Sequence, residues 1–188
     1  MSECKYFHHN DTQCHIMKEK LFTSSYILIC LANFLTSFSF FLLVPTLPFY
    51  IVDKYNVDAS MVGLLLSCYV VAVLCIRPFA GFVADFFQRK KVYVISYVLF
   101  AISFAGYLPI GESLLAFVLL RVFHGFAFGA LNTTGNTLVI DIMPSSRRGE
   151  GLGYFGVTNN LAMAFGPMAG LFLISKYSYD ILFIAALL

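Results

Sequence analysis

The sequence predicts an all-α integral membrane protein with five complete transmembrane helices and a truncated sixth. Of its 188 residues, 60% are hydrophobic and only 12% are charged, whereas soluble domains carry roughly a quarter charged residues. The mean hydropathy is +0.82. This composition excludes an ordinary soluble globule and a disordered tail. A net charge of +2 is too small to indicate a nucleic-acid partner.

Apolar stretches long enough to cross a lipid bilayer recur along the chain. They lie at 24–51, 60–84, 92–111, 114–140 and 152–174, and a sixth begins near Tyr179. A span needs about 20 apolar residues, and the ten from Tyr179 to Leu188 rise only about 15 Å. We therefore expect a polar tail at 1–21 and a membrane domain at 22–188 that is cut within its sixth helix.

Basic residues gather in alternate connections between these stretches. The N-terminal tail and the second and fourth loops together hold Lys5, Lys18, Lys20, Arg89, Lys90, Lys91, Arg147 and Arg148. The opposite side has only Lys54 and Lys176. Because cytoplasmic loops carry the excess of Lys and Arg, we expect a cytoplasmic N-terminus in a plasma or inner membrane.

The fourth stretch carries polar and small residues on one predicted helical face. Spacings of three or four residues place the following residues on that face: Arg121, Gly125, Gly129, Asn132 and Asn136. An arginine at membrane depth is costly unless it faces protein or water, so we expect this face to line an interior cavity. The glycines alone are equally typical of a helix-packing seam. His124, one residue off the face, is expected to be a packed histidine.

The fifth and first stretches supply further candidates. Gly166 and Pro167 predict a kink, because proline removes a backbone hydrogen bond, and that kink could be structural or a pivot. Gly153 and Gly170 lie before and after it. Asn33 in the first stretch could face the cavity or form a helix–helix hydrogen bond. The neutral candidates for contacting substrate are Asn33, Asn132, Asn136, Asn159 and Asn160.

The second loop carries a charged motif. At the expected cytoplasmic boundary the sequence carries, in this order, Gly81, Asp85, Arg89 and Lys90. Asp85 and Arg89 could pair at the i, i+4 spacing if the helix continues. Asp141, at the same end of the fourth stretch, is the expected third member of a latch.

Three motifs carry a resemblance to a known family. Gly81, Asp85, Arg89 and Lys90 match the loop signature G-x-x-x-D-R/K-x-G-R/K-R/K, from which Phe86 and Gln88 depart. Arg121 and Gly125 match the family's helix-four pair. The helix-five signature is matched by Gly153, Gly166, Pro167 and Gly170, with Ala162 and Leu171 as departures. Over roughly 22–188 the chain resembles the N-terminal six-helix half of a major facilitator superfamily transporter.

The resemblance implies a transporter rather than an enzyme, with no cofactor. Asp85, Arg89 and Asp141 would form a cytoplasmic latch between two halves, and Arg121 would tune or relay protonation. The Gly-Pro pattern is typical of proton-coupled exporters of drugs or metabolites. The partners would be a small-molecule substrate, protons, and the missing C-terminal half or a second six-helix unit. The proton-carrying acid would lie in that half, or Asp85, Asp141 or His124 would serve.

Three alternatives stay open. One is proton-coupled uptake of a sugar or other small solute. Another is a non-transporting membrane scaffold. The last is a metal-binding membrane protein, because the tail holds residue types that bind zinc, namely Cys4, His8, His9, Asp11, Cys14 and His15.

Overall fold

A computed structural model describes residues 20–111 and 113–187, and these fold into α-helices and one short 3₁₀-helix. The α-helices are α1 (Ser24–Leu43), α2 (Leu47–Tyr55), α3 (Ala59–Phe86), α4 (Arg89–Tyr107), α5 (Leu114–Ile142), α6 (Arg148–Lys176) and α7 (Tyr179–Leu187). The 3₁₀-helix η1 covers Ser145–Arg147. The expectation of an all-α chain is confirmed for the described residues.

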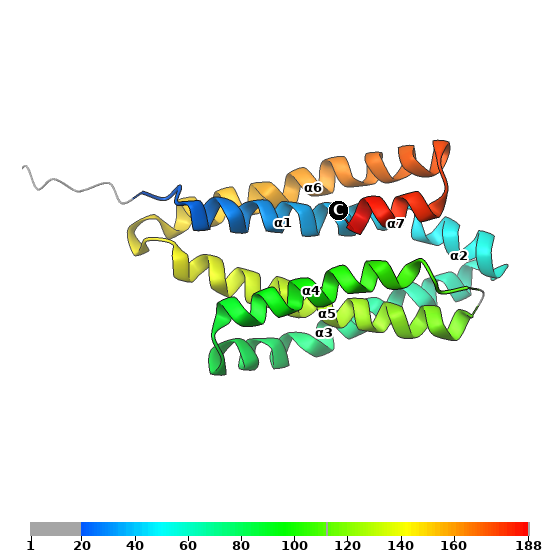
Figure 1. Ribbon diagram of the computed structural model, residues 1–188, viewed down its shortest axis with the longest axis horizontal. Coiled ribbons are helices and arrows are strands. Elements are labelled where there is room, and N and C mark those ends of the chain that lie inside the picture. The colour runs from blue at the N-terminus through cyan, green and yellow to red at the C-terminus, as the bar shows by residue number, and fades with distance from the viewer. Residues whose placement is uncertain (1–19, 112, 188) are drawn as a thin grey trace, which may run out of the picture.

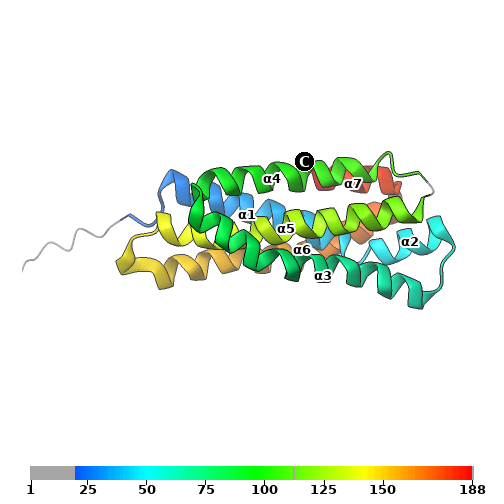
Figure 2. The same cartoon turned by 90° about the horizontal axis from the view of Figure 1, so that it is seen from below.

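Five long helices and the short α7 lie side by side in two groups (Figure 1, Figure 2). One group contains α1, α6 and α7, with α1 packed along α6; the other contains α3, α4 and α5, with α5 packed between its two neighbours. Aromatic rings join the groups. Phe40 of α1 stacks on Phe128 of α5 at 4.7 Å between centroids, and Tyr107 of α4 stacks on Phe183 of α7 at 5.0 Å.

The first predicted span is two helices rather than one. α1 ends at Leu43, a turn occupies residues 44–46, and α2 begins at Leu47. Pro45 has no backbone N–H to donate to the preceding turn, and Pro48 falls in the first turn of α2, where that loss costs little. The prediction of one continuous helix over 24–51 is therefore wrong at the prolines.

The other predicted spans agree with α3, α4, α5 and α6 to within a few residues at most ends. Within the described residues, four segments are long and apolar enough to cross a bilayer: α1, α3, α5 and the stretch from η1 through α6. The third predicted span, α4, has 19 residues and begins with Arg89, Lys90 and Lys91, which lower its mean hydropathy. α7 is a helix of nine residues.

Polar side chains and special backbone conformations mark several helix boundaries. The Thr23 side chain accepts a hydrogen bond from the Tyr26 N–H at 3.2 Å, and Asp58 accepts one from the Met61 N–H at 3.0 Å. α2 is capped at its C-terminal end by Asn56, whose φ of 52° lies in the left-handed region. These caps satisfy backbone groups that a helix end leaves unpaired.

The connections gather at two ends of the bundle (Figure 1). The α3–α4 and α5–α6 turns lie at the end where α1 begins, and they carry Arg89, Lys90, Lys91, Arg147 and Arg148. The α2–α3, α4–α5 and α6–α7 turns lie at the opposite end. The predicted separation of basic residues between two sides therefore holds for the described residues.

Candidate transport cavity and charged cluster

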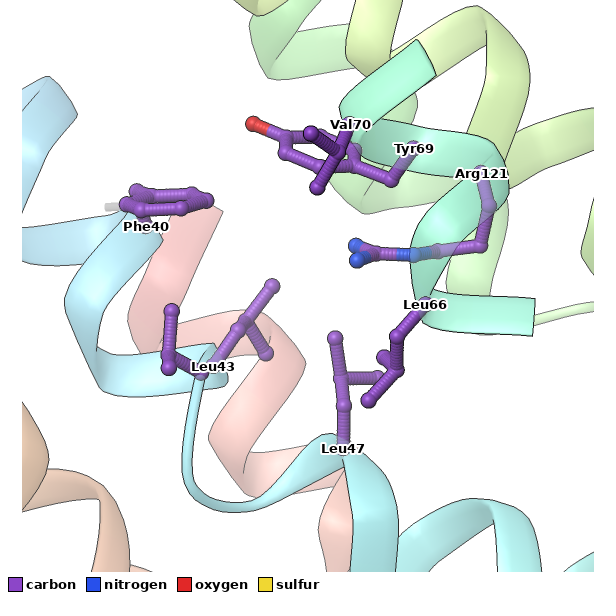
Figure 3. Close-up of a pocket in the computed structure, with 8 residues that line it drawn as sticks. Phe40, Leu43, Leu47, Leu66, Tyr69, Val70 and Arg121 are labelled. Carbon is purple, nitrogen blue, oxygen red and sulfur yellow. The ribbon is translucent and has the colours of Figure 1, made fainter. Parts of the chain in front are cut away.

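A cavity of about 220 Å³ lies between the two helix groups near the break in the first span. Figure 3 shows its walls, which come from both sides of the break and from α3 and α5. The lining residues are Phe40, Leu43, Val44, Leu47, Leu66, Tyr69, Val70 and Arg121. The cavity is therefore apolar and aromatic apart from one guanidinium and one phenol.

Arg121 is 5% exposed and extends its guanidinium into this cavity. The guanidinium carbon lies 4.4 Å from the centre of the Tyr69 ring, a cation–π contact worth about 2 kcal/mol when desolvated. Nη1 donates a long hydrogen bond to the Tyr107 hydroxyl at 3.4 Å, and Nε has no hydrogen-bond partner among the described residues. Within the described part of the chain, no carboxylate forms an ion pair with Arg121.

His124 lies directly behind this arginine. Its side chain is fully buried and contacts four aromatic rings, those of Tyr69, Phe100, Phe104 and Tyr107. Its Nδ1 is 3.1 Å from the Tyr107 hydroxyl. The expectation of a packed histidine agrees with this burial, and one tyrosine hydroxyl connects the imidazole to the guanidinium.

Tyr69 and Tyr107 were not among the residues singled out from the sequence. Both are buried, and a buried tyrosine hydroxyl usually finds a hydrogen-bond partner. That general rule does not identify which tyrosines lie near Arg121, however, because the chain holds 11 tyrosines. Only the packing of α3 and α4 against α5 brings these two rings to Arg121.

The predicted stripe on α5 divides between two environments. Gly125 and Gly129 pack against α3: a Cβ on Gly125 would lie 2.7 Å from the Tyr69 carbonyl oxygen, and one on Gly129 would lie 2.9 Å from that of Val73. These close approaches are those of a helix-packing seam, and of the stripe only Arg121 lines the cavity. Asn136 donates to Asn132 at 3.0 Å within α5 itself.

The remaining asparagines also lie outside this cavity. Asn33 donates a hydrogen bond of 2.8 Å to the Thr158 hydroxyl on α6, which is the helix–helix alternative. Asn159 is half-buried and Asn160 exposed, on α6. None of the five candidate asparagines lines the cavity, so their contact with substrate stays a prediction.

On α6, two of the singled-out glycines form a seam with α1. A Cβ on Gly166 would lie 2.7 Å from the Phe41 Cβ, and one on Gly170 would collide with the Leu42 carbonyl oxygen. Gly153 has no atom within 4 Å of such a Cβ. α6 is helical through Pro167, and the pivot role of the Gly-Pro pair stays a prediction.

The charged motif forms a cluster at the end of the bundle that carries most basic residues. Arg89 Nη1 donates to both carboxylate oxygens of Asp141, at 2.6 and 2.7 Å, and Nη2 donates to Asp85 at 2.9 Å. These hydrogen bonds raise the pKa of the Arg89 guanidinium. The sequence predicts the Asp85–Arg89 pair on one continuing helix, but α3 ends at Phe86 and α4 begins at Arg89.

This cluster joins three helices at one end. Asp85 lies one residue before the end of α3, Arg89 begins α4, and Asp141 lies one residue before the end of α5. Lys90 is exposed beside them, and no atom approaches within 4 Å of a Cβ built on Gly81. The three charged side chains remain 37% to 69% exposed, so other groups can reach them.

Residues 29–188 match the sequence profile described as Major Facilitator Superfamily. The chain belongs to this superfamily. It is 30% identical over 132 residues to the quinolone resistance protein NorA of Staphylococcus aureus, covering 70% of this chain and 34% of the relative. It is 27% identical over 168 residues to the uncharacterized MFS-type transporter C18.02 of Schizosaccharomyces pombe, covering 85% and 38%.

The major facilitator superfamily consists of transporters rather than enzymes, and its members are multi-pass integral membrane proteins, as this chain is. The chain spans little more than a third of the length of these curated relatives. The Cys/His tail, with Cys4, His8, His9, Asp11, Cys14 and His15, lies outside the described residues. Within residues 20–111 and 113–187, no group of three or more His, Cys, Asp or Glu could hold a metal ion.

Proposed function

We propose that this chain is the N-terminal half of a transporter that exports a drug-like or metabolite substrate by alternating access, in exchange for protons. The observation that carries the proposal is Arg121, a buried arginine on the wall of an aromatic cavity with no carboxylate partner in the described residues. A charge held at membrane depth costs several kcal/mol. A position that bears this cost without an ion pair is a candidate for function.

The cavity wall favours an amphipathic substrate. Phe40 and Tyr69 stack at 5.7 Å between centroids, and five aliphatic side chains, Val44 and Val70 among them, complete the lining with Arg121. Such a wall binds a flat apolar ring system, while the guanidinium supplies one strong hydrogen-bond donor. The relative named for quinolone resistance supports this substrate class.

Coupling to protons would use groups that meet at Arg121. The Tyr107 hydroxyl contacts both Arg121 and His124, so a change at the imidazole would reach the guanidinium through a single hydroxyl. We assign Arg121 the role of an electrostatic partner rather than a proton carrier. The carrier would be a carboxylate of the other half, or Asp85, Asp141 or His124.

The charged cluster would serve as a cytoplasmic latch. Its members belong to three helices, so movement of α3, α4 or α5 relative to the others would break ion pairs. The basic residues at this end support a cytoplasmic N-terminus. The missing C-terminal half, or a second six-helix unit, would complete the latch and the substrate site, as two repeats do in other transporters.

The direction of coupling can be tested with the complete protein reconstituted into proteoliposomes. A fluorescent quinolone is placed outside, and a pH gradient is imposed with either polarity. An antiporter accumulates the quinolone when the lumen is acidic, because protons leaving the lumen drive the substrate in. A symporter accumulates it when the outside is acidic, which would replace export by uptake.

Equal uptake by proteoliposomes and protein-free liposomes, at both polarities, would contradict the drug-like substrate class. The experiment needs a variant that removes function without disturbing the fold, and Arg121→Ala serves this purpose. A matched control is Arg148→Ala, which removes an arginine from the first turn of α6 at the end of the bundle, outside the cavity.

A further inference from the structure

Two apolar grooves flank the beginning of α4 on the outside of the bundle. The larger, of about 710 Å³, runs between α3 and α4, with Ile76, Val83 and Phe87 on one wall and Ile95 on the other. The smaller, of about 390 Å³, lies between α1, α4 and α5, directly beyond the last turn of α7, which packs against the same faces of α1 and α4. A helix continuing α7 would fill the smaller groove, so the inference rests on the larger one, which is separate from the cavity around Arg121.

Two adjacent lysines lie in the first turn of α4. Lys91 lines the larger groove, and Lys90 precedes it in the same turn. Both lysines are exposed, and neither forms an ion pair within the described residues. Arg89 beside them is already paired with two carboxylates. The uncompensated positive charge in this turn is therefore that of the two lysines.

The larger groove has the length of one membrane leaflet. From Ile76 to Phe87, both on its wall, a helix rises about 16 Å. Half of a bilayer's hydrocarbon core is about 15 Å. An acyl chain that begins beside Lys91 can therefore lie in the groove over the depth of its leaflet.

The walls of the groove require an apolar occupant. Phe79 is 68% exposed, Phe86 76% and Ile95 60%, and all three line the groove. An occupant that satisfies both features has an apolar tail and a negatively charged head. Phospholipids of the leaflet in which this turn lies are the molecules of that chemistry that a membrane protein always meets.

We propose that the first turn of α4 binds an anionic phospholipid, with its headgroup phosphate beside Lys90 and Lys91 and an acyl chain in the larger groove. The site is separate from the proposed export activity and does not depend on the direction of transport. The bound lipid would hold α4 against α3.

The proposal can be tested by native mass spectrometry of the complete protein in detergent, titrated with dioleoyl phosphatidylglycerol or dioleoyl phosphatidylcholine. We expect tighter binding of phosphatidylglycerol. The double variant Lys90→Gln, Lys91→Gln should weaken it about 30-fold, since each lysine near an anionic headgroup contributes about a factor of five. The control pair Lys54→Gln, Lys176→Gln removes equal charge from the opposite end and should leave binding unchanged.

The contribution of the larger groove is tested separately from that of the two lysine charges. Val83→Trp fills the larger groove and should weaken binding of both lipids, whereas Val98→Trp, at an exposed α4 position outside it, should not. Equal affinity for both lipids, or equal loss in both lysine pairs, overturns the proposal. A nitroxide at Phe79→Cys in vesicles that shows low collision with oxygen overturns it too, because a protein helix would then cover the groove.

Discussion

Replacing Gly129 by alanine should destabilise the bundle at the seam between α5 and α3. The added Cβ would overlap the Ile76 side chain and lie 2.9 Å from the Val73 carbonyl oxygen and 3.2 Å from the Val73 Cα. Two of these three neighbours are backbone atoms, which cannot rotate away, so the helices must separate. Overpacking of this kind costs about 1–3 kcal/mol, and we expect the upper half of that range.

Gly63→Ala is the matched control. Gly63 is also inside a helix, but nothing lies within 4 Å of its added Cβ. Both variants gain the same helix propensity, about 1 kcal/mol over glycine, so their difference isolates the overpacking cost. Fluorescence-detected thermal unfolding of the complete protein should place the midpoint of Gly129→Ala several degrees below that of Gly63→Ala. Equal midpoints would refute the close approach of α5 to α3.

Three further substitutions address the cavity and the cluster. Arg121→Ala should reduce proton-driven transport to the level of protein-free vesicles with normal expression; normal transport would remove this arginine from the mechanism. Tyr107→Phe deletes the hydroxyl between Arg121 and His124, so the transport rate should fall at least tenfold while the unfolding midpoint changes little; an unaltered rate would exclude the hydroxyl from coupling. Asp141→Asn removes the bidentate ion pair, so cytoplasmic thiol reagents should label the complete protein severalfold faster, whereas Glu150→Gln, which breaks a local pair at the same end, should not change labelling.

Much of the fold follows from the sequence because a membrane restricts the choices. Backbone groups in hydrocarbon must be paired within the segment, so a long apolar stretch becomes a helix. This rule locates α3, α5 and α6. It does not locate the break before Leu47, because hydropathy is continuous through Val44 and only the two prolines interrupt the hydrogen bonding.

Residues of the candidate site could be predicted from the sequence where a charge lies in an apolar stretch or where the spacing places charges together. Arg121 is conspicuous in an apolar stretch, and Asp85, Arg89 and Asp141 meet as the spacing and shared end predict. Tyr107 could not be found this way, because its partner depends on the rotation of α4 against α5. Spacing places residues on a face of one helix, but it does not say which neighbour that face meets.

The broken first span has a consequence for how the protein is made. During insertion, residues 24–51 present one apolar stretch and enter the bilayer as one segment. After folding, the 20 residues of α1 already rise about 30 Å, the thickness of the hydrocarbon core. The same stretch is thus one apolar segment in the sequence and two helices in the folded protein. Leu43 and Leu47, which line one cavity, belong to different ones.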